Sequence, residues 1–339
     1  MESIGILGAG TWGTALAKLL SEQGHKVTVW SPTGSSLELL RTEHRHPHLP
    51  GAVIPAEITF TTDAESACRG MGLVVFAVGS VYIRETARRV REYLTREQIV
   101  VNVAKGLEKG SFFTMTDVIR EELEGREGLK GIPIAALSGP THAEEVARGL
   151  PATIVAASED PETARRVQEV FSSSLMRVYT NTDVRGVEFC GALKNIMALA
   201  AGISVGLGYG DNIRAALITR GMAEIARLGT ALGCEERTFY GLAGMGDLIV
   251  TCTSMNSRNN RCGVLLGQGV KPEEAVRQVG MVVEGINALP AAMALAEKYG
   301  VDVPLISAVD AVVNRGEDPR ETLPNLMNRA RRSEFKQNT

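Results

Sequence analysis

The run Ile4-Gly5-Ile6-Leu7-Gly8-Ala9-Gly10-Thr11-Trp12-Gly13 decides the fold of the first half of the chain. In it a short apolar strand leads into the pattern Gly-x-Gly-x-x-Gly, and a helical stretch follows up to Glu22. In dinucleotide-binding folds such glycines allow a tight turn, close approach of the backbone to a pyrophosphate, and close packing of helix on strand. The free N–H groups at the start of the helix then attract the phosphates.

The context of this motif separates a phosphate-binding turn from a purely structural glycine turn, which is the alternative interpretation. A second apolar strand ends at Trp30, so the order is strand, turn, helix and strand. A dinucleotide fingerprint requires this order. Gly8, Gly10 and Gly13 are therefore predicted to form the cofactor-binding turn.

The rest of the chain divides into a part with strands and a helical part. Apolar runs without polar alternation lie at residues 73–78, 99–103, 134–137 and 152–157, and helical patterns at 83–93 and 161–171 separate them. Such runs are typical of a parallel sheet covered by helices. From about residue 183 the pattern is helical, as at 184–202, 212–232, 272–279 and 286–299. We expect a Rossmann-like doubly wound α/β sheet in a dinucleotide-binding domain, residues 1–181, and then a mostly α-helical substrate and catalytic domain, residues 182–339.

The net charge and the cysteines limit the cellular compartment and the classes of partner that we expect. The 339 residues carry a net charge of −3, with 44% hydrophobic and 22% charged residues. Without a large basic field, nucleic acid and anionic membranes are disfavoured as partners. A few local cations can still hold a small phosphate compound. The five cysteines are scattered and form no CxxC pair, which indicates reduced thiols in a cytoplasmic protein.

Neither a secretory signal nor a membrane-spanning segment is expected. The N-terminus lacks a basic region followed by a long apolar core. The most apolar stretch, residues 192–206, contains Lys194, Asn195 and several glycines. We expect these residues to interrupt it, so no stretch is predicted to cross a bilayer.

The segment after the second strand bears on the choice of coenzyme. An Asp or Glu at this place favours NAD because it binds the ribose 2′-hydroxyl. This chain has Ser31-Pro32-Thr33-Gly34 instead, with no carboxylate to repel a 2′-phosphate and no Arg or Lys to attract one. The cofactor is therefore expected to be NADPH or NADH, and the missing carboxylate favours NADPH.

Lys194 stands in an apolar helical stretch. Helical spacing places it on a face with apolar residues, namely Val187, Cys190, Ala198 and Ala201. Such a lysine either extends its amine to solvent or is desolvated, and desolvation lowers its pKa towards the range that suits proton transfer. The adjacent Asn195 offers a donor and an acceptor. The pattern leaves both alternatives open.

Three further segments are candidates for the site, each with a simpler alternative. Lys105 follows a buried strand at the carboxyl end of the sheet, where open α/β folds bind ligands, but it can also be a solvated loop lysine. Asp247 either caps a helix or orients a lysine. Ser257-Arg258-Asn259 can form an anion site at a helix start, or an ordinary solvated cap.

The alternating histidines His44, His46 and His48 suggest a metal cluster at first sight. Their flanks supply no further close ligand and no cysteine. We interpret them as a polar surface loop and expect no metal site.

Taken in order, these segments resemble the bacterial-type NAD(P)-dependent glycerol-3-phosphate dehydrogenase family over nearly the whole chain. Its most specific strings are Val103-Ala104-Lys105-Gly106-Leu107-Glu108, Ser138-Gly139-Pro140-Thr141-His142-Ala143, Gly191-Ala192-Leu193-Lys194-Asn195, and Gly241 to Leu248 continuing through Thr251-Cys252-Thr253 to Ser257-Arg258-Asn259. Two departures stand out: the family usually has a basic residue or His just after the position of Trp30, and a Pro where this chain has Gly79-Ser80.

The resemblance implies a role for each matching position. Lys194 would donate and accept the proton, while Lys105 and Asp247 would assist it. Cofactor contacts are implied for Thr11, Trp12, Lys105, Ala143, Arg258, Val282 and Glu284. Substrate contacts are implied for Lys105, Gly139, Thr141, Lys194, Asn195, Asp247, Ser257, Arg258 and Asn259.

The activity implied by the resemblance is the reduction of dihydroxyacetone phosphate to sn-glycerol 3-phosphate, which supplies glycerophospholipid synthesis. The partner is then a small phosphate substrate, and the apolar helical half is expected to form a homodimer. One rival is a dehydrogenase for a hydroxy acid or sugar acid, which would need a carboxylate-binding group in place of the Ser-Arg-Asn segment. Another is a non-catalytic dinucleotide sensor, which would have no reason to bury Lys194 beside Asp247.

Overall fold

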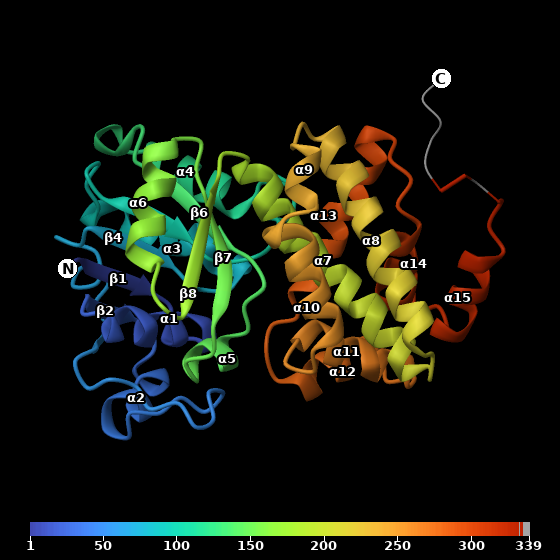
Figure 1. Cartoon of the computed structure of the whole chain (residues 1–339), viewed down its shortest axis with the longest axis horizontal. Coiled ribbons are helices and arrows are strands. Elements are labelled where there is room, and N and C mark those ends of the chain that lie inside the picture. Colours follow the sequence, from blue (N-terminus) through green and yellow to red (C-terminus); the bar gives the residue numbers. More distant parts are fainter. Residues whose placement is uncertain (332, 335–339) are drawn as a thin grey trace.

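An eight-stranded sheet and an all-helical half lie side by side in the computed structural model (Figure 1), which describes residues 1–331, 333 and 334 except for the side chain of residue 323. The predicted second domain ends at 339, so its last residues lie outside the described part. The sheet strands are β1 (Ser3–Leu7), β2 (Lys26–Trp30), β3 (Thr59–Thr61), β4 (Leu73–Phe76), β5 (Ile99–Asn102), β6 (Ile134–Ser138), β7 (Ala152–Ala157) and β8 (Met176–Asn181).

The strand order is β3-β2-β1-β4-β5-β6-β7-β8, and β1 at the centre of the doubly wound part carries the glycine turn. Strands β1 to β6 pair in parallel, which confirms the expected class. One pair departs from the expected parallel arrangement, because β7 runs antiparallel to β6. Between them the chain has only the short helix α5 (Ala143–Ala147), which packs on α1 (Thr11–Glu22) and does not form a crossover over the sheet.

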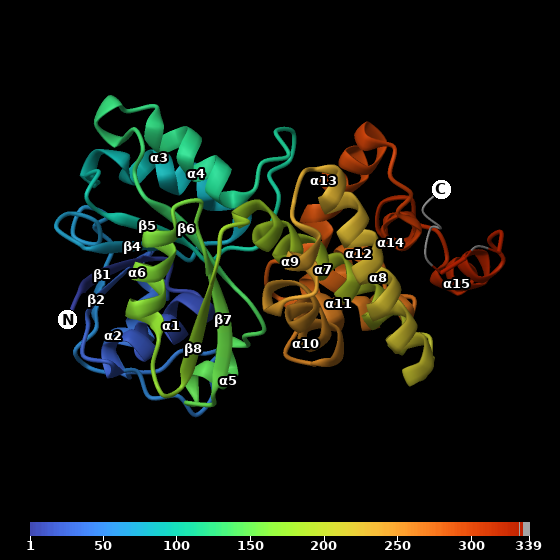
Figure 2. The same cartoon turned by 45° about the horizontal axis from the view of Figure 1, so that its top comes forward.

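Helices cover both faces of the sheet (Figure 2). One face packs on α1, α2 (Glu38–Thr42) and α6 (Pro161–Phe171), and the other on α3 (Ile83–Val90) and α4 (Met115–Glu124). Because both faces are covered, β4 is buried at every position, which explains its unbroken apolar pattern. Strands β1 to β6 end at one rim of the sheet, whereas β7 and β8 run the other way and end at the opposite rim. The turns after β1, β4 and β5 lie at the first rim and face the helical half.

The helical half is built around α7 (Val184–Gly206), which follows β8 directly. The other helices of this half pack on it or on one another: α8 (Asp211–Ala231), α9 (Glu236–Phe239), α10 (Asp247–Thr253), α11 (Arg258–Gly267), α12 (Pro272–Val279), α13 (Glu284–Tyr299), α14 (Pro304–Asn314) and α15 (Pro319–Met327). A single π-helical turn, Leu242–Gly246, leads into α10.

Helix α7 corrects one expectation of the sequence. It is continuous through Lys194, Asn195 and its glycines, and by length and composition it is long enough to cross a bilayer. Its most apolar window has a mean hydropathy of 1.4, and 83% of that window is buried inside the protein. Isolated polar residues do not break a helix whose whole surface is packed, so α7 is the core helix of this half. All five cysteines are free and buried.

Small residues set the crossing of α7 and α11. A Cβ atom added at Gly202 would lie 2.1 Å from the carbonyl oxygen of Asn260 and 2.9 Å from the Cα of Gly263. Gly206 and Gly267 meet in the same way one turn later, with a Cβ at Gly206 falling 2.9 Å from the Cα of Gly267. The backbones are therefore in direct contact, and α11 can carry its first turn close to Lys194.

Replacing Gly202 by alanine is expected to lower the free energy of unfolding by at least about 1–3 kcal/mol, because the methyl group has no room unless the helices separate. Urea denaturation measures this, with Gly210→Ala as the control, since a Cβ at Gly210 meets nothing within 4 Å. Equal denaturation midpoints for Gly202→Ala and the control would contradict the close crossing.

Candidate active site

The glycine turn after β1 requires glycine for steric reasons, as its sequence pattern predicts. Gly8 has a φ of +127°, and a Cβ there would lie 2.6 Å from the carbonyl oxygen of Ala77. A Cβ on Gly13 would lie 2.1 Å from the carbonyl oxygen of Gly8. Gly10 is the N-cap of α1 and has nothing within 4 Å of its missing side chain. Gly8 and Gly13 thus pack the turn, while Gly10 leaves open space in front of the free N–H groups of α1.

A cleft of about 500 Å³ lies between this rim of the sheet and helices α7, α11 and α13. Most of the residues expected at the site line it, namely Gly10, Thr11, Trp12, Lys105, Thr141, Ala143, Lys194, Asn195, Ser257, Arg258, Asn259, Val282 and Glu284. Gly8, Gly13, Gly139 and Asp247 are buried and do not line it. The hydroxyl of Thr11 and Nε2 of His142 are buried without a hydrogen-bond partner within the described structure. These atoms and the open α1 terminus fit a polar ligand such as a dinucleotide.

Asp247 joins the two lysines at the centre of the site. Its Oδ2 accepts a hydrogen bond of 2.6 Å from Nζ of Lys105, and its Oδ1 accepts one from Nζ of Lys194. Asp247 is fully buried, and Lys194 is only 6% exposed. Asp247 begins α10 but makes no side-chain cap there. The alternatives left open by the sequence are therefore resolved: Lys194 is desolvated, and Asp247 binds lysines and does not cap its helix.

Two more acceptors complete this cluster. The carbonyl oxygen of Gly139 lies 3.2 Å from Nζ of Lys105, so the turn after β6 helps to hold that lysine. The hydroxyl of Thr251 lies 2.7 Å from Nζ of Lys194 and donates to the carbonyl of Asp247. Thr251 was not among the expected site residues. Its position one turn after Asp247 on α10 is the signal that could have identified it.

The electrostatics of the cluster favour a lysine that titrates near neutrality. Burial lowers the pKa of Lys194 to about 7; the carboxylate of Asp247 opposes this shift and Lys105 adds to it. Burial alone would raise the pKa of Asp247, but the two lysines outweigh it and hold that pKa below its usual value. Asp247 therefore stays ionised, and Lys194 can both give and take a proton at physiological pH.

Asn195 and Asn259 are bound to each other and to the backbone. Nδ2 of Asn259 donates to Oδ1 of Asn195 at 2.9 Å, and Oδ1 of Asn259 accepts from the N–H of Gly285 at 2.8 Å. Nδ2 of Asn195 donates to the carbonyl of Gly191 at 3.1 Å. Both amides line the cleft, but they also tie α7, α11 and the start of α13 together, which the sequence did not reveal.

The first turn of α11 is both a cap and part of the cleft wall. The hydroxyl of Ser257 accepts from the N–H of Asn260, so Ser257 is the N-cap. Arg258 follows it and is partly buried in the cleft, where burial lowers its pKa and Glu284 and Glu144 oppose that shift. A guanidinium thus stands beside a helix N-terminus, an arrangement suited to an anion.

Glu284 links the two halves of the molecule across the cleft. Its carboxylate accepts from the N–H of Ser80 at 3.1 Å and from the hydroxyl of Ser80 at 2.6 Å. Ser80 belongs to Gly79-Ser80, one of the two places where the chain departs from the family pattern. This departure therefore lies at a contact between the sheet half and α13, beside the cleft that Gly79 and Glu284 line.

The end of β2 has a positive charge nearby that comes from another element. The guanidinium of Arg89 on α3 lies 5.7 Å from the ring centroid of Trp30, so a cation is present at the end of β2 although Ser31-Pro32-Thr33-Gly34 contains none.

The histidines of the 44–48 segment form no metal cluster in the part of the chain that the structure describes. The ring centroids of His46 and His48 are 5.8 Å apart, and within the described residues no group of three or more His, Cys, Asp or Glu side chains could hold a metal ion.

Comparison with known proteins identifies the family. Residues 3–164 match the model of the N-terminal part of NAD-dependent glycerol-3-phosphate dehydrogenases, and residues 183–324 match that of the C-terminal part. The chain is 56% identical to the NAD(P)+ glycerol-3-phosphate dehydrogenase 2 of Lactobacillus delbrueckii subsp. bulgaricus, with 99% of both chains covered. It is 50% identical to the corresponding enzyme of Moorella thermoacetica, with 98% of both chains covered.

The fold gives the same answer. The crystal structure of glycerol-3-phosphate dehydrogenase from Coxiella burnetii superposes with a TM-score of 0.90 at 37% identity, covering 97% of this chain and 99% of that one. The expected class of activity, an NAD(P)-dependent oxidoreductase acting on a CH–OH group, is that of these relatives. This chain is therefore a member of the NAD-dependent glycerol-3-phosphate dehydrogenase family.

Proposed function

We propose that this chain reduces dihydroxyacetone phosphate to sn-glycerol 3-phosphate with a reduced nicotinamide dinucleotide, and that Lys194 supplies the proton. One observation carries the assignment of Lys194: its amine is buried, bound to Asp247 and Thr251, and still lines the cleft. The reaction supplies the glycerol phosphate on which glycerophospholipid synthesis depends.

Each residue of the cluster has a distinct task in this proposal. When bound, the reduced nicotinamide supplies the hydride that reaches C2 of the substrate. Negative charge then grows on the carbonyl oxygen, and Lys194 as an ammonium stabilises that charge and gives up its proton. Asp247 holds Nζ of Lys194 in place, and Lys105 adds a second positive charge from the sheet side. In the reverse direction, neutral Lys194 takes the proton from the C2 hydroxyl.

The phosphate end of the substrate is proposed to lie at the first turn of α11. Ser257, Arg258 and Asn259 offer N–H groups and a guanidinium there. Lys105 and Thr141 line the opposite wall, and Gly139 lies behind it and accepts a hydrogen bond from Lys105. Thr11, Trp12, Ala143, Val282 and Glu284 are proposed to contact the dinucleotide, with Arg258 between both ligands.

Replacing Arg258 by alanine is expected to raise the KM for dihydroxyacetone phosphate about 10- to 100-fold, the loss of one charge-assisted hydrogen bond. The effect on kcat should be smaller, because the phosphate is bound equally in the ground and transition states. Steady-state kinetics measure both constants. Arg277→Ala, on the exposed side of α12, is the matched control. An unchanged KM in Arg258→Ala would place the phosphate elsewhere.

NADPH is proposed as the preferred coenzyme. No carboxylate stands in Ser31-Pro32-Thr33-Gly34, and Arg89 over Trp30 brings a positive charge to the end of β2. An absorbance assay with dihydroxyacetone phosphate and each reduced coenzyme in turn tests the reaction and the preference together. We expect turnover with both and a larger kcat/KM with NADPH. No oxidation of either coenzyme would overturn the proposed function, and a larger kcat/KM with NADH would overturn only the preference.

We also propose that the chain acts in the cytoplasm as two domains, residues 1–181 and 182–339, without inserting stably into a membrane or binding nucleic acid. The division is supported by the end of β8 at Asn181 and the start of α7 at Val184. Limited proteolysis is expected to cut between these residues before it cuts within either half. Initial cleavage inside the sheet would contradict the division.

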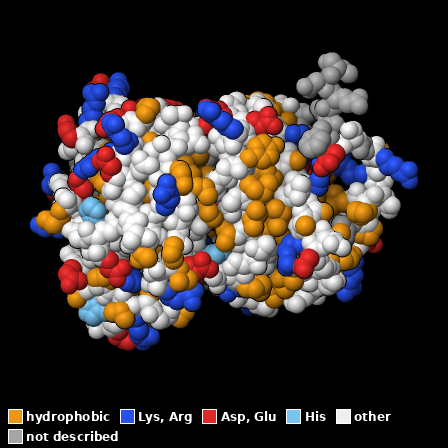
Figure 3. Space-filling model, viewed as in Figure 1, with side chains coloured by type: hydrophobic (Ala, Val, Ile, Leu, Met, Phe, Trp, Pro, Cys, Tyr) orange, Lys and Arg blue, Asp and Glu red, His pale blue; other side chains and the backbone are white. Residues whose placement is uncertain are grey.

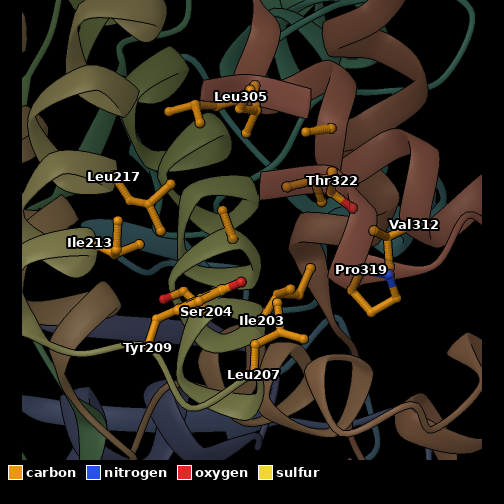
Figure 4. Close-up of a pocket in the computed structure, with 14 residues that line it drawn as sticks. Ile203, Ser204, Leu207, Tyr209, Ile213, Leu217, Leu305, Val312, Pro319 and Thr322 are labelled. Atoms are coloured by element: carbon orange, nitrogen blue, oxygen red, sulfur yellow. The ribbon is translucent and has the colours of Figure 1, made fainter. Parts of the chain in front are cut away.

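A homodimer is proposed to form through the helical half. Figure 3 shows a band of hydrophobic side chains over this half, and exposed members of the half include Val205, Tyr209, Tyr240 and Ile249. Figure 4 shows an apolar groove between α7, α8, α14 and α15, into which Leu207, Leu217 and Val312 point. Symmetric dimers commonly bury such surfaces. Light scattering after gel filtration is expected to give twice the chain mass of 36.3 kDa, and a monomer at all concentrations would contradict the proposal.

A further inference from the structure

Glu188 is a buried carboxylate with no part in the proton transfer described above. It lies on α7 and is 5% exposed. Within the described residues, no lysine, arginine or histidine lies within salt-bridge distance of it. Four hydrogen bonds from three donor groups converge on it instead: Oε1 accepts from Nδ2 of Asn102 at 2.7 Å, the N–H of Thr116 lies 3.1 and 3.3 Å from the two oxygens, and the hydroxyl of Thr116 donates to Oε2.

These donors come from two elements of the sheet half. Asn102 is the last residue of β5, and Thr116 lies in the first turn of α4, two residues after its N-cap Thr114. A carboxylate from α7 therefore caps a helix of the other half and holds a strand end at the same time. The N–H groups and the dipole of α4 favour the anionic form, although burial outweighs them and raises the pKa of Glu188.

Asn102 passes this contact on to the backbone that carries Lys105. Its Nδ2 also donates to the carbonyl of Ala104, and its Oδ1 accepts from the N–H of Ala104, both at 3.0 Å. Asn102 thus holds both the backbone N–H and the backbone carbonyl of Ala104, the residue just before Lys105. One side-chain amide connects it directly to Glu188.

Helix α7 also packs against the aliphatic part of the Lys105 side chain. A Cβ atom added at Gly191 would lie 3.3 Å from Cγ of Lys105 and 3.5 Å from its Cδ, so the lysine stem lies against the bare backbone of α7. Glu188, Gly191 and Lys194 follow one another along one side of the helix, because residues three apart are neighbours on a helix surface. One side of α7 therefore holds the loop of Lys105, supports its stem and carries Lys194.

We propose that Glu188 is a positioning residue for the reaction: through Asn102 it fixes the Lys105 loop on α7, so that both lysines meet Asp247 at a set distance and Lys105 faces the substrate. This inference rests on the substrate contact of Lys105 proposed above. A carboxylate can accept from all of these donors at once, whereas a glutamine has only one accepting oxygen. Its NH2 group would have to donate to the Thr116 hydroxyl, which would then turn away from its present orientation, and the N–H of Thr116 would lose one of its two acceptors.

A second buried glutamate provides a matched control. Glu224 is 2% exposed, accepts from the N–H groups of Leu305 and Ile306 at the start of α14, and does not line the cleft. Burial is the main cause that raises the pKa of both Glu188 and Glu224 to about 7. Glu188→Gln and Glu224→Gln should therefore lower the melting temperature to a similar extent, and only the first should affect the active site.

The test measures the Kd of sn-glycerol 3-phosphate by calorimetry in a double-mutant cycle with Lys105→Met. The reduced coenzyme is bound throughout, so that no turnover occurs. We expect Glu188→Gln to weaken binding on the order of tenfold when Lys105 is present, because a charge-assisted contact is misaligned. In the Lys105→Met background the loss should fall below about twofold. Glu224→Gln should bind like the wild type in both backgrounds.

Asn102→Ala is the alternative variant if Glu188→Gln does not fold. It removes the hydrogen bonds by which Asn102 connects Glu188 to Ala104, and it keeps the bonds between Glu188 and Thr116 on α4. It should produce the same loss as Glu188→Gln, and the two should not add when combined. Equal losses in both Lys105 backgrounds, or no loss in either variant, would overturn the positioning role. A wild-type protein that neither binds glycerol 3-phosphate nor oxidises a coenzyme with dihydroxyacetone phosphate would instead overturn the proposed function.

Discussion

Lys194→Ala is expected to lower kcat by about 10²–10⁴-fold while the protein still folds and binds its coenzyme. The reason is that the amine is the only proton donor that both lines the cleft and bonds to Asp247 and Thr251 in the described site. Asp247 keeps Lys105 as a partner in the variant, so no carboxylate is left unpaired. The fold should therefore tolerate the change better than the chemistry does.

The measurement separates these effects. Turnover is followed by absorbance, and coenzyme binding by energy transfer from Trp12, which lines the cleft and is one of only two tryptophans. Lys298→Ala, an exposed lysine on α13, is the control and should keep full activity. A kcat of Lys194→Ala close to that of the wild type would remove Lys194 from the proton transfer.

Asp247→Asn is expected to be the most damaging single change, because it affects both stability and turnover. It leaves Lys105 and Lys194 close together, without the carboxylate that bridges them and with one amine almost fully buried. Breaking a buried ion pair from one side typically costs about 3–5 kcal/mol of unfolding free energy. Catalysis should also be lost, because nothing then holds Nζ of Lys194 in place.

The stability loss should depend on pH in a defined direction. Asp247 raises the pKa of Lys194, so in Asp247→Asn the folded state gives up that proton at a lower pH than the wild type does. The unfolded lysine keeps its proton up to about pH 10.4. Fewer protons bound in the folded state mean that stability rises with pH. The deficit against the wild type should thus shrink as the pH rises towards about 7 and stay constant above it. Urea denaturation on both sides of that pH tests this, and a pH-independent deficit would contradict it.

The sequence was informative where local pattern determines structure. The glycine turn, the buried strands and the long helices all follow from spacing and composition, and Gly8 and Gly13 are required by close approach of backbone atoms. Strands β3 and β8 were missed because one is only three residues long and the other alternates buried and exposed residues at the edge of the sheet. The reversed direction of β7 depends on how α5 packs on α1, which no local pattern encodes.

The site was predictable as a set of residue types but not as a network. Lys194 in an apolar stretch allowed two interpretations, and only the position of Asp247, far along the chain, decides between them. The bond between Asn195 and Asn259, the role of Thr251, and the relay from Glu188 to Lys105 are all contacts between elements. Arg89 on α3 lies over Trp30, so the positive charge near the end of β2 could not be predicted from the residues of the following loop alone.

The pH dependence of catalysis tests the central claim most directly. Burial lowers the pKa of Lys194 to about 7, and the oxidation of sn-glycerol 3-phosphate needs this amine neutral. The rate of the chemical step in that direction should therefore rise with pH through about 7 and level off above it, and reduction should fall over the same range. In Lys194→Met this dependence should vanish along with most of the rate. If the same rise with pH persists in Lys194→Met, another group transfers the proton and the account is wrong.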